Sequence, residues 1–207
     1  MTNARSTVKQ LLALIAAMAT SPLILATRVE ELFGRGEVVF KICGQLLCLF
    51  PGIPGSYLRR GFYMGTLKRC SHDVHIDLGS LFAHRTTEVG ARVVIGAFTL
   101  IGCARIGEDV LIGSRVSLIS GRNTHKDGSG TIGHDTIYRS IEIGKRTWIG
   151  DGAIVMNDVG ERCVVGAGSV VVKSAPSGHL AVGNPARFIC KNTPENATVA
   201  DSVTPES

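Results

Sequence analysis

Residues 89–118 read VGARVVIGAFTLIGCARIGEDVLIGSRVSL, and residues 143–171 read IGKRTWIGDGAIVMNDVGERCVVGAGSVV. Both stretches advance in steps of about six residues, and an aliphatic residue, often followed by glycine, opens each step. One step of five residues and one of four interrupt the series. The openers are Val89, Ile95, Ile101, Ile106, Ile112, Leu118, Ile143, Ile149, Val155, Val159, Val165 and Val171.

A second small or β-branched residue follows four positions after many of the openers. These residues are Val93, Thr99, Val110, Val116, Thr147, Ala153, Cys163 and Ser169. A period of six fits neither the two-residue period of a strand nor the 3.6-residue period of a helix. Repeats of this kind stack as coils that share one apolar interior. The pattern therefore predicts a parallel β-helix with the openers inside, and glycines where the backbone turns or approaches closely.

The composition agrees with a β-helix and places the basic charge at one end of the chain. Of the 207 residues, 44% are hydrophobic and only 5% aromatic, a balance that suits a narrow prism filled by Ile, Val and Leu. Residues 1–70 contain 9 Lys and Arg against 3 Asp and Glu, a net charge of +6. Residues 71–207 contain 13 against 14, a net charge of −1. The near-neutral repeat gives no reason to expect nucleic acid as a partner.

The cysteines favour reduced thiols in a cytosolic protein. They show no Cys-x-x-Cys pair and no spacing typical of zinc ligands. We therefore expect neither a disulfide framework nor a bound metal. The six are Cys43, Cys48, Cys70, Cys103, Cys163 and Cys190.

The apolar run Leu11–Thr27, LLALIAAMATSPLILAT, has four open interpretations. A spanning helix needs roughly 20 apolar residues, and this run is shorter and contains Pro22. The small residues Ala17-Met18-Ala19 resemble a signal-peptide cleavage site, although the chain after them stays apolar. A monotopic anchor would place two helices, broken at Pro22, in the cytoplasmic leaflet with basic residues on anionic lipid. The last interpretation is a hydrophobic helix that covers the open end of the β-helix.

A second apolar segment, residues 33–50, is expected to be helical from about Glu37, because two glycines interrupt what precedes it. Residues 51–55, PGIPG, are expected to end this helix as a rigid turn. Residues 56–70 mix aromatic and basic side chains. That mixture suits either a membrane interface or a polar face packed beside the β-helix.

These patterns divide the chain into three parts. Residues 1–70 form an apolar and basic helical extension, and residues 71–190 form the β-helix domain. Residues 191–207 lack an apolar pattern and are expected to be a flexible tail. The first, irregular strands of the repeat are expected at Val74, Ile76, Leu78 and Leu81.

The repeat fails between Leu118 and Ile143, where residues 119–142 read ISGRNTHKDGSGTIGHDTIYRSIE. A polar, glycine-rich insertion in a strict repeat forms a loop on one face. This one carries His125, and Lys126, Asp127 and His134 are nearby. A histidine beside an acidic residue can act as a general base near neutral pH, or it can be a solvated loop residue without a chemical role.

The repeat, the loop SGRNTHKDG (residues 120–128), the segment TWIGDGAIVMNDVGERCVVGAGSVVVKSAP (residues 147–176) and the ending AVGNPARFI (residues 181–189) resemble the hexapeptide-repeat acyltransferases. That family includes the maltose, galactoside, xenobiotic and serine acetyltransferases and enzymes that acetylate envelope sugars. The resemblance covers about residues 72–191. It implies an all-β fold, a left-handed parallel β-helix, which departs from the usual right-handed crossover. It also implies a homotrimer with active sites between subunits and acetyl-CoA as the acyl donor.

The resemblance implies that His125 is the catalytic residue. It would take the proton from an acceptor hydroxyl as that oxygen attacks the thioester carbonyl. Asn123 or Asp127 would orient it, and backbone N–H groups along the coils would stabilise the oxyanion. A ternary complex needs no covalent enzyme intermediate.

Five further residues match positions that bind coenzyme A in the family. Trp148 matches a tryptophan beside the active site, although a turn-packing role would place it there equally. Ala167 and Gly168 match positions along the pantetheine arm, where small residues permit close approach. Lys173 and Arg187 match basic positions near the phosphates, unless they are ordinary surface charges.

The helical extension resembles that of acyltransferases in bacterial polysaccharide or lipid-linked sugar pathways. It implies an acceptor at the membrane, such as a lipid-linked sugar, a glycolipid or a nascent polysaccharide. The predicted location is cytoplasmic, or peripheral on the inner face of the cell membrane.

Two other functions remain open for such a chain. A zinc enzyme resembling the γ-class carbonic anhydrases needs three converging histidines, and the sequence offers no convincing third ligand beside His125 and His134. A non-catalytic β-helix scaffold would not bind CoA. The histidines are His72, His75, His84, His125, His134 and His179.

Overall fold

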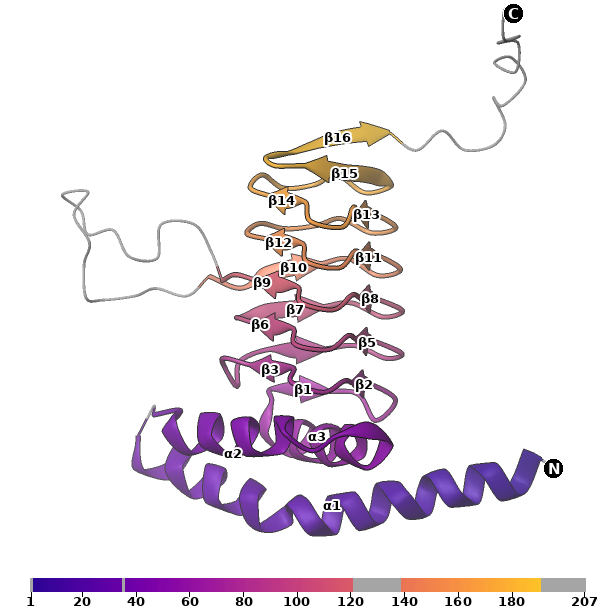
Figure 1. Cartoon of the computed structure of the whole chain (residues 1–207). Coiled ribbons are helices and arrows are strands. Elements are labelled where there is room, and N and C mark those ends of the chain that lie inside the picture. The colour runs from indigo at the N-terminus through magenta and orange to yellow at the C-terminus, as the bar shows by residue number, and fades with distance from the viewer. Residues whose placement is uncertain (1, 35, 121–138, 191–207) are drawn as a thin grey trace, which may run out of the picture.

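The chain folds as three N-terminal helices followed by a β-helix of about five turns (Figure 1). The computed structural model describes residues 2–34, 36–120 and 139–190, and the side chains from residue 11 onward. The helices lie across one end of the β-helix, and the last strands lie at the other end (Figure 1). The predicted parallel β-helix with an N-terminal helical extension is confirmed.

Three sheets form the sides of the β-helix, and the chain visits them in turn. Sheet A contains β1 (Arg69–Cys70), β4 (Glu88–Val89), β7 (Ala104–Ile106) and β10 (Ile141–Ile143). Sheet B contains β2 (His75–Ile76), β5 (Val94–Ile95), β8 (Leu111–Ile112), β11 (Trp148–Ile149), β13 (Val164–Val165), β15 (His179–Gly183) and β16 (Ala186–Cys190). Sheet C contains β3 (Leu81–Phe82), β6 (Leu100–Ile101), β9 (Ser117–Leu118), β12 (Ile154–Val155) and β14 (Val170–Val171). All pairs are parallel except β15–β16.

The interior of the β-helix is filled as the repeat predicts. Every opener named above is at most 2% exposed, and so is every second residue of the steps. The shortened steps keep the coils in register, because Ile106 still pairs with Val89 and Val165 with Ile149. Sheet A continues beyond β10 through isolated bridges at Val159 and Ala175.

The glycines after the openers serve close approach between coils. A Cβ placed on Gly96 would lie 2.6 Å from the carbonyl carbon of Gly113 in the next coil. Positive φ falls instead on the second residue of the turns, at Gly168 and at several non-glycine residues. The latter are Arg92, Phe98, Asp109, Arg115, Arg146 and Arg162.

Helix α1 (Thr2–Phe33) runs through Pro22, so the break that the monotopic interpretation expected there is wrong. Proline removes the N–H that would bond the carbonyl four residues earlier, here that of Met18. The Ser21 hydroxyl donates to the Met18 carbonyl at 2.8 Å and replaces the lost bond. The segment Leu11–Phe33 is long and apolar enough to cross a membrane by length and composition, criteria that a signal sequence or a buried core helix also meets.

Helices α2 (Val38–Cys48) and α3 (Gly52–Thr66) close the end of the β-helix. The predicted start of α2 near Glu37 is confirmed. The predicted rigid turn is too long, because α3 already begins at Gly52 and contains Pro54. A proline in the first turn of a helix loses no intrahelical bond there.

Large aromatic side chains from the helices pack against the open end of the first coil. Phe40 of α2 and Phe62 and Tyr63 of α3 are almost fully buried, and the Tyr63 ring lies 4.6 Å from that of Phe82 in β3. Residues 56–70 therefore pack on the β-helix, as one of the two interpretations expected. Of the residues expected in the first strands, Ile76 lies in β2 and Leu81 in β3, whereas Val74 and Leu78 lie outside the strands. Val74 and Ile76 are buried, and Phe82 is the buried residue of β3.

Four side chains clamp α1 and α2 to the first coil. The Glu30 carboxylate accepts hydrogen bonds from the Val39 N–H (2.8 Å) and from Arg85 (2.7 Å). The Glu37 carboxylate lies 2.7 Å from the His84 ring and accepts a hydrogen bond from the Arg85 N–H at 3.0 Å. Because His84 and Arg85 follow β3, these contacts tie the helices to the β-helix.

Candidate active site

The insertion that interrupts the repeat falls between β9 and β10. His125, the predicted general base, belongs to residues 121–138, which lie outside the described residues. Asn123, Asp127 and His134 lie there too. The described ends of the insertion nevertheless define where it is attached.

Both ends of the insertion are fixed at the corner between sheets C and A, here called the C–A corner. The Cys103 N–H donates to the Ser120 hydroxyl at 2.6 Å, and the Ile141 N–H donates to the Cys103 carbonyl at 3.1 Å. On the returning side, the Arg139 guanidinium lies 3.9 Å from the Asp158 carboxylate. The insertion therefore starts and ends within the third and fourth coils.

Lys173 lies at the same corner in a later coil, just after β14 (Val170–Val171). Its neighbour Ser174 donates a hydrogen bond to the Asn157 side chain at 2.9 Å, and Asn157 donates to the Val172 carbonyl at 3.4 Å. The Lys173 side chain is exposed. The structure thus brings the attachment of the insertion and Lys173 to one edge of the prism.

Trp148 opens β11 on sheet B, with its side chain pointing outward. It pairs with Leu111 of β8 and Val164 of β13. Its side chain is 53% exposed, so it does not pack into the interior. With Val94 and Leu111 it forms an outward apolar row on this sheet.

Ala167 and Gly168 form the turn between β13 and β14, here called the B–C corner. Gly168 has φ +67°, and its N–H donates to the Asp151 carbonyl of the coil below at 2.8 Å. A Cβ on Gly150 would lie 2.6 Å from the Ala167 nitrogen, so the two coils meet tightly there. No atom lies within 4 Å of a Cβ position on Gly168. The outer side of this turn is therefore bare backbone, which an extended ligand can approach.

Arg187 lies on β16, opposite Val182 of β15, and is exposed. It belongs to the final hairpin, which ends sheet B.

The described site residues therefore fall into separate places. Trp148 and the Ala167–Gly168 turn lie on and beside sheet B, whereas Lys173 lies with the insertion across sheet C.

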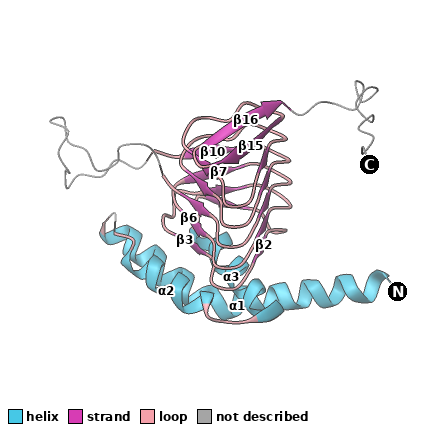
Figure 2. Cartoon of the chain, turned by 45° about the horizontal axis from the view of Figure 1, so that its top comes forward, coloured by secondary structure: helices cyan, strands magenta, loops and turns pink. Residues whose placement is uncertain are grey.

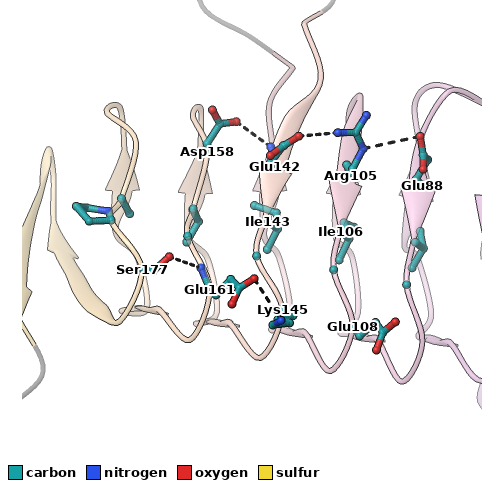
Figure 3. A pocket seen from close by; sticks show the side chains of 18 of the residues that line it. Glu88, Arg105, Ile106, Glu108, Glu142, Ile143, Lys145, Asp158, Glu161 and Ser177 are labelled. Carbon is teal, nitrogen blue, oxygen red and sulfur yellow. Dashed lines mark hydrogen bonds and ion pairs between the residues drawn. The ribbon is translucent and has the colours of Figure 1, made fainter. Parts of the chain in front are cut away.

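A groove runs along sheet A and contains none of the predicted site residues. Its volume is about 710 Å³, and two charged rows flank it (Figure 3). Arg105 joins Glu142 at 2.6 Å and approaches Glu88 at 3.9 Å, and Lys145 lies 3.5 Å from Glu161. These pairs neutralise most of its charge.

No strong base stands out in this groove. Glu88 is bonded to Lys68 at 2.7 Å, and that bond holds the pKa of the carboxyl below its ordinary value. A carboxylate of this kind is a weak proton acceptor at neutral pH. The alternating charges Glu88, Arg105 and Glu142 stand directly before openers, so the sequence contains the signal for this row.

The described histidines do not converge on a metal site. His75 lies 3.1 Å from the Ser56 hydroxyl, His84 contacts Glu37, and His179 lies 2.9 Å from the Ser177 carbonyl. Within residues 2–34, 36–120 and 139–190, no three His, Cys, Asp or Glu side chains gather to hold a metal. None of the six cysteines, all of which lie in the described part of the chain, forms a disulfide.

Comparison with known proteins identifies relatives of the β-helix. No protein-family model matches the chain. A bifunctional GlmU protein of Rubrobacter xylanophilus is 37% identical over 112 residues, which cover 54% of this chain and 22% of that protein. The chain thus spans less than a third of the length of the curated relatives it matches first.

Solved structures match more of the chain at lower identity. A hexapeptide-repeat acetyltransferase from Vibrio cholerae is 22% identical, covers 80% of this chain and 90% of its own, and has a TM-score of 0.63. Its complex with acetyl coenzyme A has a TM-score of 0.56 at 20% identity, over 72% and 85% of the two chains. A maltose O-acetyltransferase from Clostridium difficile has a TM-score of 0.58 at 21% identity, over 72% and 83%. This chain has the fold of the hexapeptide-repeat acetyltransferases.

Proposed function

We propose that this protein transfers an acetyl group from acetyl-CoA to a hydroxyl of a sugar. One observation carries the proposal. The polar insertion with His125 is attached at a corner of a β-helix whose closing coils carry the bare Ala167–Gly168 turn and Lys173. The solved structures compared above support it, since they are acetyltransferases by title and one is complexed with acetyl-CoA.

In the proposed reaction His125 acts as a general base. It takes the proton of the acceptor hydroxyl while that oxygen attacks the thioester carbonyl carbon. The tetrahedral oxyanion collapses, the bond to sulfur breaks, and His125 returns the proton to the leaving CoA thiolate. Donor and acceptor bound together supply the proximity, so no acyl-enzyme is required.

The coenzyme would lie along the closing coils. The turn at Ala167 and Gly168 offers bare backbone for the pantetheine arm, whose amides can bond to backbone groups. Lys173 and Arg187 would make charge-assisted contacts with the phosphates. Trp148 would cover the thioester end with its exposed ring.

We further propose that the active unit is a homotrimer with sites between copies. Trp148 and the Ala167–Gly168 turn lie on the far side of sheet C from the insertion that carries His125. One site uses both groups when the C–A corner of one copy meets the B–C corner of the next. This contact joins two different surfaces, and in the proposed trimer three such contacts close a ring.

The acceptor is proposed to be at the membrane, as a lipid-linked sugar, a glycolipid or a nascent polysaccharide on the cytoplasmic face. Two features support this class. Residues 1–70 carry a net charge of +6, which favours anionic lipid. Helix α1 also presents many large apolar side chains to solvent.

The test is thiol release from acetyl-CoA with a panel of free and lipid-linked sugars. His125→Ala should reduce turnover by about 10²–10⁴-fold, the usual contribution of a general base, with CoA binding retained. His134→Ala, in the same insertion, is the matched control and should keep turnover near the wild-type value. Equal turnover in wild type and His125→Ala would remove His125 from the mechanism. Absence of CoA binding to the wild type would overturn the acetyltransferase proposal.

A further inference from the structure

Helix α1 exposes its large apolar side chains on the side that faces away from the rest of the protein. It buries the small or hydroxyl-bearing residues Ala16, Thr20 and Thr27. A helix of a soluble protein instead turns its large apolar side chains toward the core. The exposed large apolar residues of α1 are Leu11, Leu12, Leu14, Ile15, Met18, Leu25, Val29, Leu32 and Phe33.

Small residues also bring α1 and α3 into close contact. A Cβ on Gly61 would lie 3.1 Å from the Thr20 hydroxyl, and one on Gly65 would lie 2.6 Å from Ile24. Gly61 and Gly65 form a Gly-x-x-x-Gly pair, an arrangement common where helices pack within lipid. The buried Thr20 hydroxyl donates to the Ala16 carbonyl of its own helix at 2.8 Å. The Thr20 hydroxyl in this contact therefore needs no hydrogen bond to water.

Helix α2 and the start of α3 extend the same apolar surface, here called the platform face. Their exposed apolar residues are Val38, Ile42, Leu46, Leu49, Phe50 and Ile53. A pocket of about 760 Å³ joins them to α1, lined on one side by Ala19 and Leu23 and on the other by Leu46, Leu49 and Phe50. Nearly all of its lining is hydrocarbon, and three of these side chains are more than half exposed at its mouth.

Basic side chains stand beside this apolar surface. Lys41 lies one turn from Val38 on the exposed side of α2, and Arg28 lies between Leu25 and Leu32 on α1. Long basic side chains beside buried apolar ones reach toward lipid phosphates. Arg28 and Lys41 are paired with Glu31 (3.0 Å) and Glu37 (3.9 Å), so the argument rests on the net charge of the segment. The charge of +6 over residues 1–70 favours an anionic bilayer over a second copy of the platform face, which would oppose like charges.

The orientation of α1 decides how the molecule sits on lipid. In Figures 1 and 2 α1 lies crosswise at the end of the β-helix, and the coils rise away from it. A helix that lies in the interface plane and contributes one apolar face is the monotopic arrangement. The apolar residues of α2 and α3 lie on helices too short to cross a bilayer, and they would enter the same layer.

We propose that the platform face lies in the headgroup region of an anionic bilayer, with the β-helix standing away from the membrane, and that the pocket between α1 and α2 takes a hydrocarbon chain of a bilayer lipid. This proposal deepens and rests on the membrane role given under the proposed function. It adds a lipid-chain site that is separate from the acetyl-transfer residues. In the proposed trimer three platform faces would point the same way and bind one membrane together.

The single tryptophan of the chain permits a direct test. Full-length protein is bound to vesicles of phosphatidylcholine and phosphatidylglycerol whose acyl chains carry a nitroxide quencher. In a Leu46→Trp, Trp148→Phe variant the new tryptophan should lose most of its emission. The native Trp148, on the β-helix, should keep its emission on the same vesicles.

Flotation of the vesicles gives the second readout. Leu25→Asp combined with Leu49→Asp should weaken vesicle binding at least about tenfold, since two large apolar side chains leave the lipid. Phe98→Asp is the matched control, because Phe98 is as exposed but lies on the β-helix, and it should leave flotation unchanged.

Three outcomes would overturn the proposal. Equal quenching of both tryptophans would mean that the β-helix lies along the membrane. Binding without quenching at position 46 would remove the lipid-chain site. A protein that pairs through its helices and does not float would assign the face to a second copy. Acetyl transfer to soluble sugars is measured separately, so a failure of either proposal leaves the other distinguishable.

Discussion

Arg59 is the largest fully buried side chain of the protein, and it has no carboxylate partner among the described residues. Its guanidinium donates to the Leu47 and Phe50 carbonyls at 3.1 and 2.7 Å, and to the Ile76 carbonyl at 3.1 Å. Burial lowers its pKa, which reports the cost of holding a cation there. The side chain thus joins the end of α2 to β2 while carrying a desolvation penalty.

We expect the hydrogen bonds to outweigh that penalty. Arg59→Met removes the guanidinium donor from three carbonyls and should lower the free energy of unfolding by about 1–3 kcal/mol. Urea denaturation followed by circular dichroism measures the change. Arg60→Met is the matched control, since Arg60 stacks on the Tyr57 ring at the surface (4.4 Å) and should cost at most about 0.5 kcal/mol. An unchanged or raised stability for Arg59→Met would mean that desolvation dominates.

The bare turn at Ala167 gives a second prediction at this scale. Ala167→Phe places a ring over the proposed path of the pantetheine arm without requiring positive φ at that residue. The KM for acetyl-CoA should rise about tenfold or more, since the arm loses contacts worth over 1.4 kcal/mol. Ala97→Phe, at the equivalent turn of an earlier coil, should leave that KM unchanged. Equal effects of the two substitutions would point to a general disturbance of the coils.

At the scale of elements, the clamp of Glu30, Glu37, His84 and Arg85 holds the helices on the β-helix. Burial alone would raise the pKa of the Glu37 carboxyl, but the bonds from His84 and the Arg85 N–H bring it below its ordinary value of 4.5. The same balance holds for Glu30, whose bonds come first from the Val39 and Phe40 N–H groups and then from Arg85. The charged forms are therefore favoured by folding.

This balance fixes the sign of a pH effect. A carboxyl with a depressed pKa in the folded state contributes stability that is complete above the ordinary value and lost as pH falls below it. Thermal unfolding of the wild type should therefore move to lower temperature below about pH 4.5. A Glu30→Gln, Glu37→Gln variant should be less stable at pH 7, and its difference from the wild type should shrink in acid. A difference that stays constant with pH would exclude a role for these two charges.

The elements also differ in how well their buried residues can be predicted from the sequence. The buried openers could be predicted from the sequence because each coil needs an aliphatic residue at the same step of the repeat. The inward residue of β3 in the first coil could not be predicted in this way. The end of that coil is closed by Phe40, Phe62 and Tyr63 from distant helices, which favour Phe82 as the inward residue. The helix continues through Pro22, against the monotopic interpretation, because the cost of the proline is offset by the neighbouring Ser21 hydroxyl, a contact that periodicity does not reveal.

At the scale of the whole molecule, the candidate site was less predictable than the fold. The resemblance to the acetyltransferases named Trp148, Lys173 and Arg187, but their places on different sides of the prism follow from the coil register. His125 lies outside the described residues, so its role stays a prediction. A site formed by two copies cannot be predicted from the periodic pattern of one chain, because that pattern specifies only the coils of its own chain.

The central claim is acetyl transfer at a site that joins His125 of one copy to the Ala167 turn of the next. The most direct measurement mixes two impaired variants, His125→Ala and Ala167→Phe, unfolded and refolded together in equal amounts and assayed well below the KM for acetyl-CoA. If copies assort at random in closed rings, one site in four combines two intact halves, and about a quarter of wild-type turnover should return. Refolded alone, each variant should keep at most about a tenth of wild-type turnover under these conditions. Mixed oligomers, verified by two affinity tags, that show no turnover above either variant alone would contradict the account.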